Sequence, residues 1–207
     1  KLREMFLATK AQKDHLGIEL FEQIKSVRFM EQPWAMKDAR FCFTLPVWLS
    51  VFPNAKIIRL RRHGVDVAAS MYQRQSALVG QFCRTYGLEE IPITTRFRTG
   101  FIEHSLRCTE LEGAFSLWEE YEQQINTLLQ QTELPAMTIQ FETLLQNPVR
   151  HIAELLAFCE LRGKDISLDA LQELANSHEA YKYLGDAALV SFAEGQAKRL
   201  AALDYQP

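Results

Sequence analysis

Apolar residues recur along the chain at the spacing of a helix in some stretches and as short β-rich runs in others. The helical spacing predicts helices at residues 16–24, 45–52, 65–72, 118–129, 148–159 and 167–205, the last broken near Gly185. Pro46 is expected in the first turn of the second of these helices. The β-rich runs predict strands at 55–61 and 135–141, with a further brief one at 34–37. Strands separated by helices over these distances are typical of βαβ crossovers, so we expect an α/β fold with a helix-rich C-terminal part.

The periodic pattern fails between residues 84 and 113. Glycines, one proline and four arginines interrupt this stretch, and a mixed sequence without a sustained period is typical of a long loop or lid. Because arginines stand beside Phe97 and Phe101, we expect residues 84–113 to select an acidic or amphipathic acceptor. The whole chain, residues 1–207, is expected to form a single domain that includes this lid.

The composition narrows the classes of function. Twenty-three Lys and Arg residues stand against 26 Asp and Glu residues, a net charge of -3 that lacks the cationic surplus of a dedicated nucleic-acid binder. Hydrophobic residues make up 47% of the chain, enough for a sizeable core, while no apolar stretch reaches the length of a membrane span. The first residues lack the apolar run of a secretory signal, so the cytoplasm is the expected location.

The cysteines and histidines do not suggest a metal site. The four cysteines are widely spaced, and the sequence contains no C-x-x-C pair and no two histidines at i, i+4. We therefore expect reduced thiols and no bound metal.

The most informative stretch joins the first of the two main strands to the helix that follows it. Arg59, Arg61 and Arg62 gather where the strand ends, and the carboxyl end of a parallel strand beside a helix N-terminus is where anionic ligands dock. Ser70, one turn after Asp66, adds a hydroxyl donor. These residues predict a site for one small phosphate. The alternative, equally open from the pattern alone, is a solvated strand end whose arginines pair with nearby acids such as Asp66.

Several longer motifs surround this strand end. They are Lys37-Asp38-Ala39-Arg40, the Leu-Pro helix and strand of residues 45–58, the spacing of seven residues between Arg62 and Ser70, Trp118-Glu119-Glu120-Tyr121, and the run at 139–148 with its Glu-x-Leu and Asn-Pro. In these motifs, over about residues 34–161, the chain resembles sulfotransferases that use 3′-phosphoadenosine-5′-phosphosulfate (PAPS). The spacing from Arg62 to Ser70, together with the preceding Leu-Pro helix, is the most specific part of the resemblance.

The resemblance implies a P-loop NTPase-like sulfotransferase fold, in which a three-layer parallel sheet is flanked by helices. It implies PAPS as co-substrate, with the sulfuryl group passing in line to a hydroxyl or amine of a small-molecule or glycan acceptor. Arg62 and Ser70 take the positions that hold the 3′-phosphate of the cofactor, so the resemblance and the strand-end pattern predict the same site. Phe141 matches a position that is often aromatic and near adenine, although packing in the strand core is the plainer expectation.

The catalytic residues are less well specified. Lys37 matches a lysine that points toward the sulfuryl end in the family, with an exposed ion pair to Asp38 as the alternative. For the general base the candidates are Asp38 and the Glu103-His104 pair in the irregular stretch, since a carboxylate or imidazole near the acceptor would suffice. An exposed loop histidine is the plainer interpretation of His104.

Two departures from the family pattern bear on activity. The family turn after the phosphate-binding arginine is Asp-Pro or Asn-Pro, whereas this chain has His63-Gly64, which still permits a tight turn and would add a pH-dependent charge beside a phosphate. None of the nine glycines lies in the Ser-Gly-Thr loop that wraps the 5′-phosphosulfate in the family. The N-terminal strand and this loop are expected to precede Lys1.

The missing loop keeps two other functions open. One is a non-catalytic nucleotide-binding or assembly module that keeps the fold and the 3′-phosphate site. The other is a different nucleotide-dependent transferase, such as a small-molecule kinase, which would need a phosphate loop equally. The sequence leaves homo-oligomer formation open as well.

Overall fold

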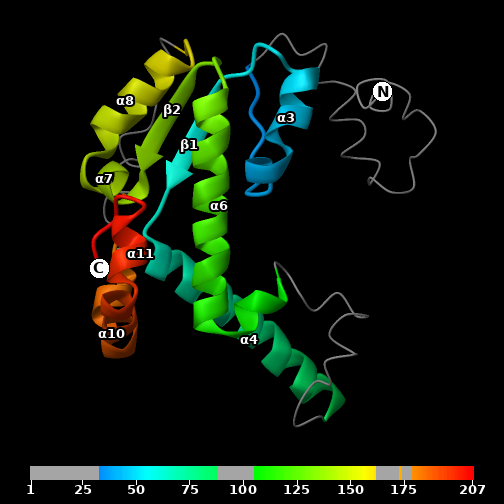
Figure 1. The fold of residues 1–207 in the computed structure, drawn as a ribbon, viewed down its shortest axis with the longest axis vertical. Coiled ribbons are helices and arrows are strands. Elements are labelled where there is room, and N and C mark those ends of the chain that lie inside the picture. Colours follow the sequence, from blue (N-terminus) through cyan, green and yellow to red (C-terminus); the bar gives the residue numbers. More distant parts are fainter. Residues whose placement is uncertain (1–32, 88–104, 162–172, 174–178) are drawn as a thin grey trace, which may run out of the picture. The chain divides into compact units, whose positions relative to one another are not determined.

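The computed structural model describes residues 33–87, 105–161, 173 and 179–207 (Figure 1). Within these ranges the chain divides between Ala55 and Lys56 into two compact units. The second unit carries the two strands that the structure describes. A single domain over the whole chain stays a prediction, and the helix expected at 16–24 lies outside the described residues.

The first unit is built on helix α3 (Phe41–Val51), which confirms the helix expected at 45–52 but begins earlier. Its early start has a local cause. The Asp38 carbonyl accepts the N–H of the first helical residue at 3.1 Å, and the Asp38 side chain accepts the Arg40 N–H at 2.8 Å. Pro46 therefore lies inside the helix and not in its first turn.

The stretch before α3 is held by aromatic packing. Residues 34–37, expected as a brief strand, have no regular secondary structure, so this prediction is wrong. The Trp34 ring instead packs edge-on against Phe52 with the centroids 5.0 Å apart, and Phe52 stacks on Trp48 at 6.4 Å. A contact between rings, rather than a neighbouring strand, thus places this segment.

The second unit contains a parallel pair of strands, β1 (Ile57–Arg61) and β2 (Ala136–Gln140). They pair in register from Ile57 with Ala136 to Arg61 with Gln140, which confirms both predicted strands (Figure 1). The chain between them is helical, as expected of a βαβ crossover. The described residues contribute these two strands only, so the three-layer sheet stays a prediction.

Two long helices follow β1 and form most of the core with the C-terminal residues. Helix α4 (Gly64–Tyr86) begins two residues after β1 and packs along α6 (Leu111–Gln131). The buried cluster comprises Val65, Ala68, Cys108, Ala114, Phe115, Trp118, Tyr183, Ala193, Leu200, Leu203 and Tyr205. Gly64 lets α4 approach Trp118 of this cluster closely, because a Cβ at residue 64 would lie 2.5 Å from the Trp118 ring.

The stretch expected as a loop or lid, residues 84–113, is narrower in the structure. Helix α4 continues into this stretch as far as Tyr86. Gly87 ends the helix with a left-handed φ of 63°, a conformation that glycine tolerates best. The 3-10 helix η2 (Leu106–Thr109) and the first turn of α6 occupy the other end. Residues 88–104 lie outside the described residues, so a lid that selects the acceptor stays a prediction.

After β2 the chain turns directly into short helices. Phe141, expected to close the strand, opens helix α7 (Phe141–Gln146). Helix α8 (Pro148–Phe158) confirms the helix expected from residue 148. Asn147 caps α8 by accepting the Arg150 N–H at 3.4 Å, and the proline takes the first turn, where its missing N–H costs nothing.

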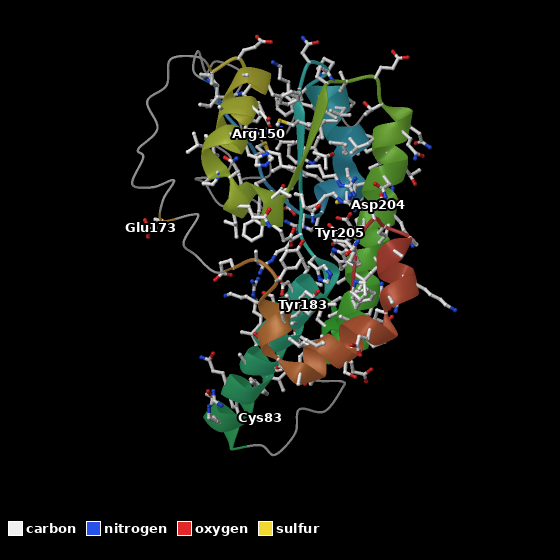
Figure 2. All side chains as sticks on the ribbon, turned by 90° about the vertical axis from the view of Figure 1, so that its left-hand side faces the viewer. Cys83, Arg150, Glu173, Tyr183, Asp204 and Tyr205 are labelled. Atoms are coloured by element: carbon white, nitrogen blue, oxygen red, sulfur yellow. The ribbon has the colours of Figure 1, made fainter. Side chains whose placement is uncertain are left out.

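The C-terminal part is helical, as predicted. Its elements are η3 (Lys182–Gly185), α10 (Ala187–Gly195) and α11 (Ala197–Ala201). The boundary between η3 and α10 confirms the break expected near Gly185, while residues 162–172 and 174–178 lie outside the described residues. Tyr183 and Tyr205, both labelled in Figure 2, are buried in the core of this unit.

Candidate functional site

A cavity of about 310 Å³ opens beside the N-terminal half of α4. Its lining combines cations, carboxylates, a hydroxyl and an amide from two parts of the chain: Arg62, Asp66, Ala69, Ser70, Gln73, Glu179, Lys182, Tyr183, Gly185, Asp186 and Leu189. Arg62 and Ser70 are the two residues that the sequence predicts around a phosphate. The structure therefore brings them together on one cavity.

Arg62 reaches this cavity with its donors only partly used. Its Nη2 donates to the Glu179 carbonyl at 2.7 Å and lies 3.6 Å from Asp66 Oδ2, so the ion pair of the alternative interpretation is present too. The guanidinium carbon lies over the Phe141 ring, 4.9 Å from its centroid. Arg62 Nε is buried and has no hydrogen-bond partner in the described part of the chain. The guanidinium thus has donor capacity left for an anion.

Asp66 also lines the cavity and fixes the C-terminal residues beside it. Its side chain is 1% exposed and accepts the backbone N–H of Tyr183 at 2.9 Å and that of Lys182 at 3.3 Å. The contact brings Lys182, 116 residues away along the chain, to the cavity that Arg62 lines. Sequence reasoning missed Lys182, because no local pattern links it to the end of β1.

His63, expected beside the phosphate, is buried at 1% exposure and does not line the cavity. Its ring stacks on Tyr183 with centroids 4.5 Å apart. Nδ1 accepts the Val65 N–H at 3.3 Å, and Nε2 lies 2.7 Å from the Gln206 carbonyl, an arrangement that fits a neutral ring with its proton on Nε2. His63 therefore caps α4 and contacts the C-terminal tail, and it does not line the cavity where the sequence placed it beside a phosphate.

Glu142 holds the turn that carries Arg62. The Glu142 side chain is fully buried, and its Oε1 accepts the backbone N–H of His63 at 2.7 Å. Its Oε2 accepts from Gln140 Nε2 at 2.6 Å. Because His63 follows Arg62 directly, the first of these hydrogen bonds fastens the turn after β1 to the start of α7, and a satisfied buried carboxylate of this kind specifies a unique backbone position.

Arg59 and Arg61, predicted to join Arg62 around one phosphate, are engaged elsewhere. Arg59 Nη2 and Arg61 Nε both donate to Glu122 Oε2 on α6, at 2.6 and 3.0 Å, and Arg59 Nη1 donates to Asn126 Oδ1 at 2.7 Å. Alternate residues of a strand share one face, so both side chains face α6, whereas Arg62 lies beyond the strand. The predicted cluster of three cations is therefore wrong, and of the three only Arg62 lines the cavity.

Tyr205 lies beside this ion-pair cluster, with the Arg61 guanidinium carbon 4.7 Å from its ring centroid. Burial, followed by the nearby Glu122 charge, raises the pKa of Tyr205 to about 12. The neutral phenol is therefore favoured in the folded protein. Stability from this group is present below the unfolded pKa of about 10 and is lost as pH rises towards the folded value.

Relative to Tyr205→Phe, the wild type is expected to lose about 1.4 kcal/mol of unfolding free energy between about pH 9 and pH 11. The measurement is urea unfolding at both pH values. Tyr86→Phe is the matched control, since Tyr86 is 64% exposed and its removal should leave the pH dependence of the wild type unchanged. A Tyr205→Phe protein that loses as much stability as the wild type would contradict the burial of this phenol.

The candidate catalytic residues belong to other parts of the chain than the cavity does. Lys37 is exposed in the first unit. Its neighbour Asp38 binds Arg40, whose Nε lies 3.0 Å from both carboxylate oxygens, and this hydrogen bonding lowers the pKa of Asp38. His104 lies outside the described residues. Lys37 and Asp38 belong to the first unit and the cavity to the second, so all three catalytic roles stay predictions.

The described residues also bear on the expectations for metals, thiols and membranes. Within the described ranges no group of three or more His, Cys, Asp or Glu side chains could hold a metal ion. The four cysteines all lie within the described ranges, and none of them is in a disulfide there. No described helix combines the length and the apolar composition needed to cross a bilayer.

A cation-bearing cavity at the junction of a parallel strand and a helix is typical of α/β proteins that bind phosphorylated ligands. A family model described as "Sulfotransferase family" matches residues 4–165, which is most of the chain. The chain therefore belongs to the sulfotransferase family, which confirms the resemblance found in its motifs and indicates a transferase with the P-loop-like α/β fold. No curated protein and no solved structure matches the chain significantly.

Proposed function

We propose that the protein is a PAPS-dependent sulfotransferase that moves a sulfuryl group to a hydroxyl or amine of a small-molecule or glycan acceptor. The observation that carries this proposal is the meeting of Arg62 and Ser70 on one cavity. Their spacing in the sequence predicts that the two residues share one phosphate site, and this prediction does not depend on the cavity that both of them line. Family membership supports sulfuryl transfer in general.

The lining of the cavity fits the 3′-phosphate of the cofactor. Arg62 offers a buried Nε without a partner among the described residues, Ser70 a hydroxyl donor, and Lys182 an ammonium group. A phosphate monoester carries nearly two negative charges, so it suits a site with two cations. Phe141, whose ring lies under the Arg62 guanidinium, would keep that side chain oriented towards the ligand.

The remaining roles follow the family pattern residue by residue. When bound, PAPS supplies the activated sulfuryl group. Lys37 would stabilise the charge that develops at the leaving and bridging oxygens, and Asp38 or His104 would accept the proton of the acceptor. The lowered pKa of Asp38 makes it a weak base, which favours a role in orienting the acceptor by a hydrogen bond. The cytoplasm is the proposed location.

A second candidate is a nucleotide-binding or assembly module without transfer activity. It needs only the 3′-phosphate site, and the two residues predicted for that site, Arg62 and Ser70, line one cavity. The two candidates share the 3′-phosphate site and differ in transfer. A radiolabelled PAPS assay with a panel of hydroxyl and amine acceptors therefore separates them, since binding without label transfer favours the module.

The shared site is tested by calorimetry with adenosine 3′,5′-bisphosphate, the product left after transfer. Ser70→Ala is expected to weaken binding about two- to tenfold, the effect of removing one neutral hydrogen bond. The control is Ser50→Ala in α3, whose hydroxyl donates to the Val47 carbonyl at 2.7 Å and lies in the other unit. No detectable heat from the wild type at millimolar nucleotide would contradict the proposed function.

A further inference from the structure

The two cations of the cavity share a carboxylate partner within the protein. Glu179 Oε2 lies 3.8 Å from Arg62 Nη2, and Glu179 Oε1 forms an ion pair with Lys182 Nζ. The backbone carbonyl of the same residue accepts from Arg62 at 2.7 Å. One residue thus holds a negative charge next to both of the groups that would bind a phosphate.

Glu179 differs from Asp66, the other carboxylate near Arg62. The Asp66 side chain is 1% exposed, and its oxygens accept two backbone N–H groups, so it is fixed in place. The Glu179 side chain is 39% exposed. Ion pairs that remain in contact with water are weak and exchange their partners readily. The Glu179 carboxylate can therefore leave the two cations without opening the fold, whereas Asp66 cannot.

We propose that the Glu179 carboxylate is an internal competitor for the nucleotide phosphate: it neutralises Arg62 and Lys182 in the free protein and is displaced when the ligand binds. The proposal rests on the proposed function, because the ligand is the 3′-phosphate of the cofactor. The ion pair with Lys182 also holds the pKa of Glu179 below its ordinary value, so the competing charge is present at neutral pH.

The competitor also gives the site a preference. A phosphate monoester brings close to two negative charges and three acceptor oxygens, whereas Glu179 brings one charge and two oxygens. A dianionic phosphate therefore displaces the carboxylate more readily than a singly charged ligand does, because the singly charged ligand gains little over the partner it replaces. The site is expected to select terminal phosphate monoesters over carboxylates and phosphodiesters.

The test compares Glu179→Gln with the wild type by calorimetry, using adenosine 3′,5′-bisphosphate as the probe. Glutamine keeps the shape and the backbone carbonyl but removes the charge, so binding is expected to tighten about two- to fivefold, the upper part of the range of exposed ion pairs. Glu154→Gln is the matched control. Glu154 forms an exposed pair with Arg150 on α8 at 2.8 Å and does not line the cavity, so this variant removes the same charge elsewhere.

The outcomes distinguish this inference from the proposed function. If Glu179→Gln binds no more tightly than the wild type while Arg62→Ala binds more weakly, Glu179 does not compete with the ligand. The proposed phosphate site at Arg62 is then retained. Equal tightening by Glu154→Gln assigns the gain to net charge and also overturns the competitor. Unchanged binding in both Arg62→Ala and Glu179→Gln overturns the proposed site as well. Circular dichroism and thermal unfolding verify that each variant is folded.

Discussion

Glu122→Ala is expected to lower the free energy of unfolding by about 3–5 kcal/mol, the cost of breaking a buried ion pair by removing one partner. Glu122 Oε2 accepts from Arg59 Nη2 at 2.6 Å and from Arg61 Nε at 3.0 Å. The side chains are 10% exposed for Glu122 and Arg59 and 14% for Arg61. Without the carboxylate, two guanidinium groups stay between β1 and α6, and no other described carboxylate forms an ion pair with them, so their desolvation is left uncompensated.

The same helix provides the control for this prediction. Glu120 pairs with Arg107 at 2.5 Å, but that pair is largely exposed, at 52% and 42% for the two side chains. Glu120→Ala should therefore cost less than about 1 kcal/mol. Urea unfolding measures both variants. The structure indicates that the buried cluster joins the sheet to α6. A loss of unfolding free energy in Glu122→Ala no larger than that in Glu120→Ala would contradict this.

Arg62→Ala is expected to weaken the binding of adenosine 3′,5′-bisphosphate by about ten- to a hundredfold. This range corresponds to the loss of a hydrogen bond to a charged group, about 1.5–3 kcal/mol. The affinity of Arg62→Lys should lie between those of the wild type and Arg62→Ala, since lysine keeps the charge but loses the planar fork and the stacking over Phe141. Calorimetry on folded protein measures all three affinities.

Arg150→Ala is the matched control for this loss. It removes the same charge from α8, where the Arg150 side chain is 70% exposed and lies away from Tyr183, which lines the cavity (Figure 2). Its affinity should stay close to that of the wild type, because an exposed charge at a distance is screened by salt. An equal loss in both variants would mean that net charge, and not the cavity, governs binding.

The parts of the fold that could be predicted are those with local causes. The strands β1 and β2 follow from β-rich runs bounded by turn residues, and α8 follows from its Asn-Pro start. Arg62 and Ser70 could be paired from the sequence for the same reason, since both belong to one strand-to-helix turn and its helix. The left-handed Gly87 that ends α4 was available as a signal, but the aperiodic stretch after it obscured the true end of the helix.

The errors at the candidate site involve partners that are distant in the sequence. From the sequence, Arg59 and Arg61 have no evident partner at the end of their strand. In the structure both donate to Glu122, 61 residues beyond Arg61. His63 lies off the cavity, and its ring instead forms a hydrogen bond with the Gln206 carbonyl, 143 residues away. Lys182 was missed because its place depends on a hydrogen bond to Asp66 across 116 residues. Local patterns do not encode these long-range contacts.

The role of Arg62 is tested most directly by two nucleotides that differ only in the 3′-phosphate. Adenosine 3′,5′-bisphosphate and adenosine 5′-monophosphate are titrated into the wild type and into Arg62→Ala, which closes a thermodynamic cycle. The cavity of Arg62, Ser70 and Lys182 predicts that Arg62→Ala weakens the bisphosphate about ten- to a hundredfold and leaves the monophosphate nearly unchanged. The same fold loss for both nucleotides would contradict a 3′-phosphate held by Arg62.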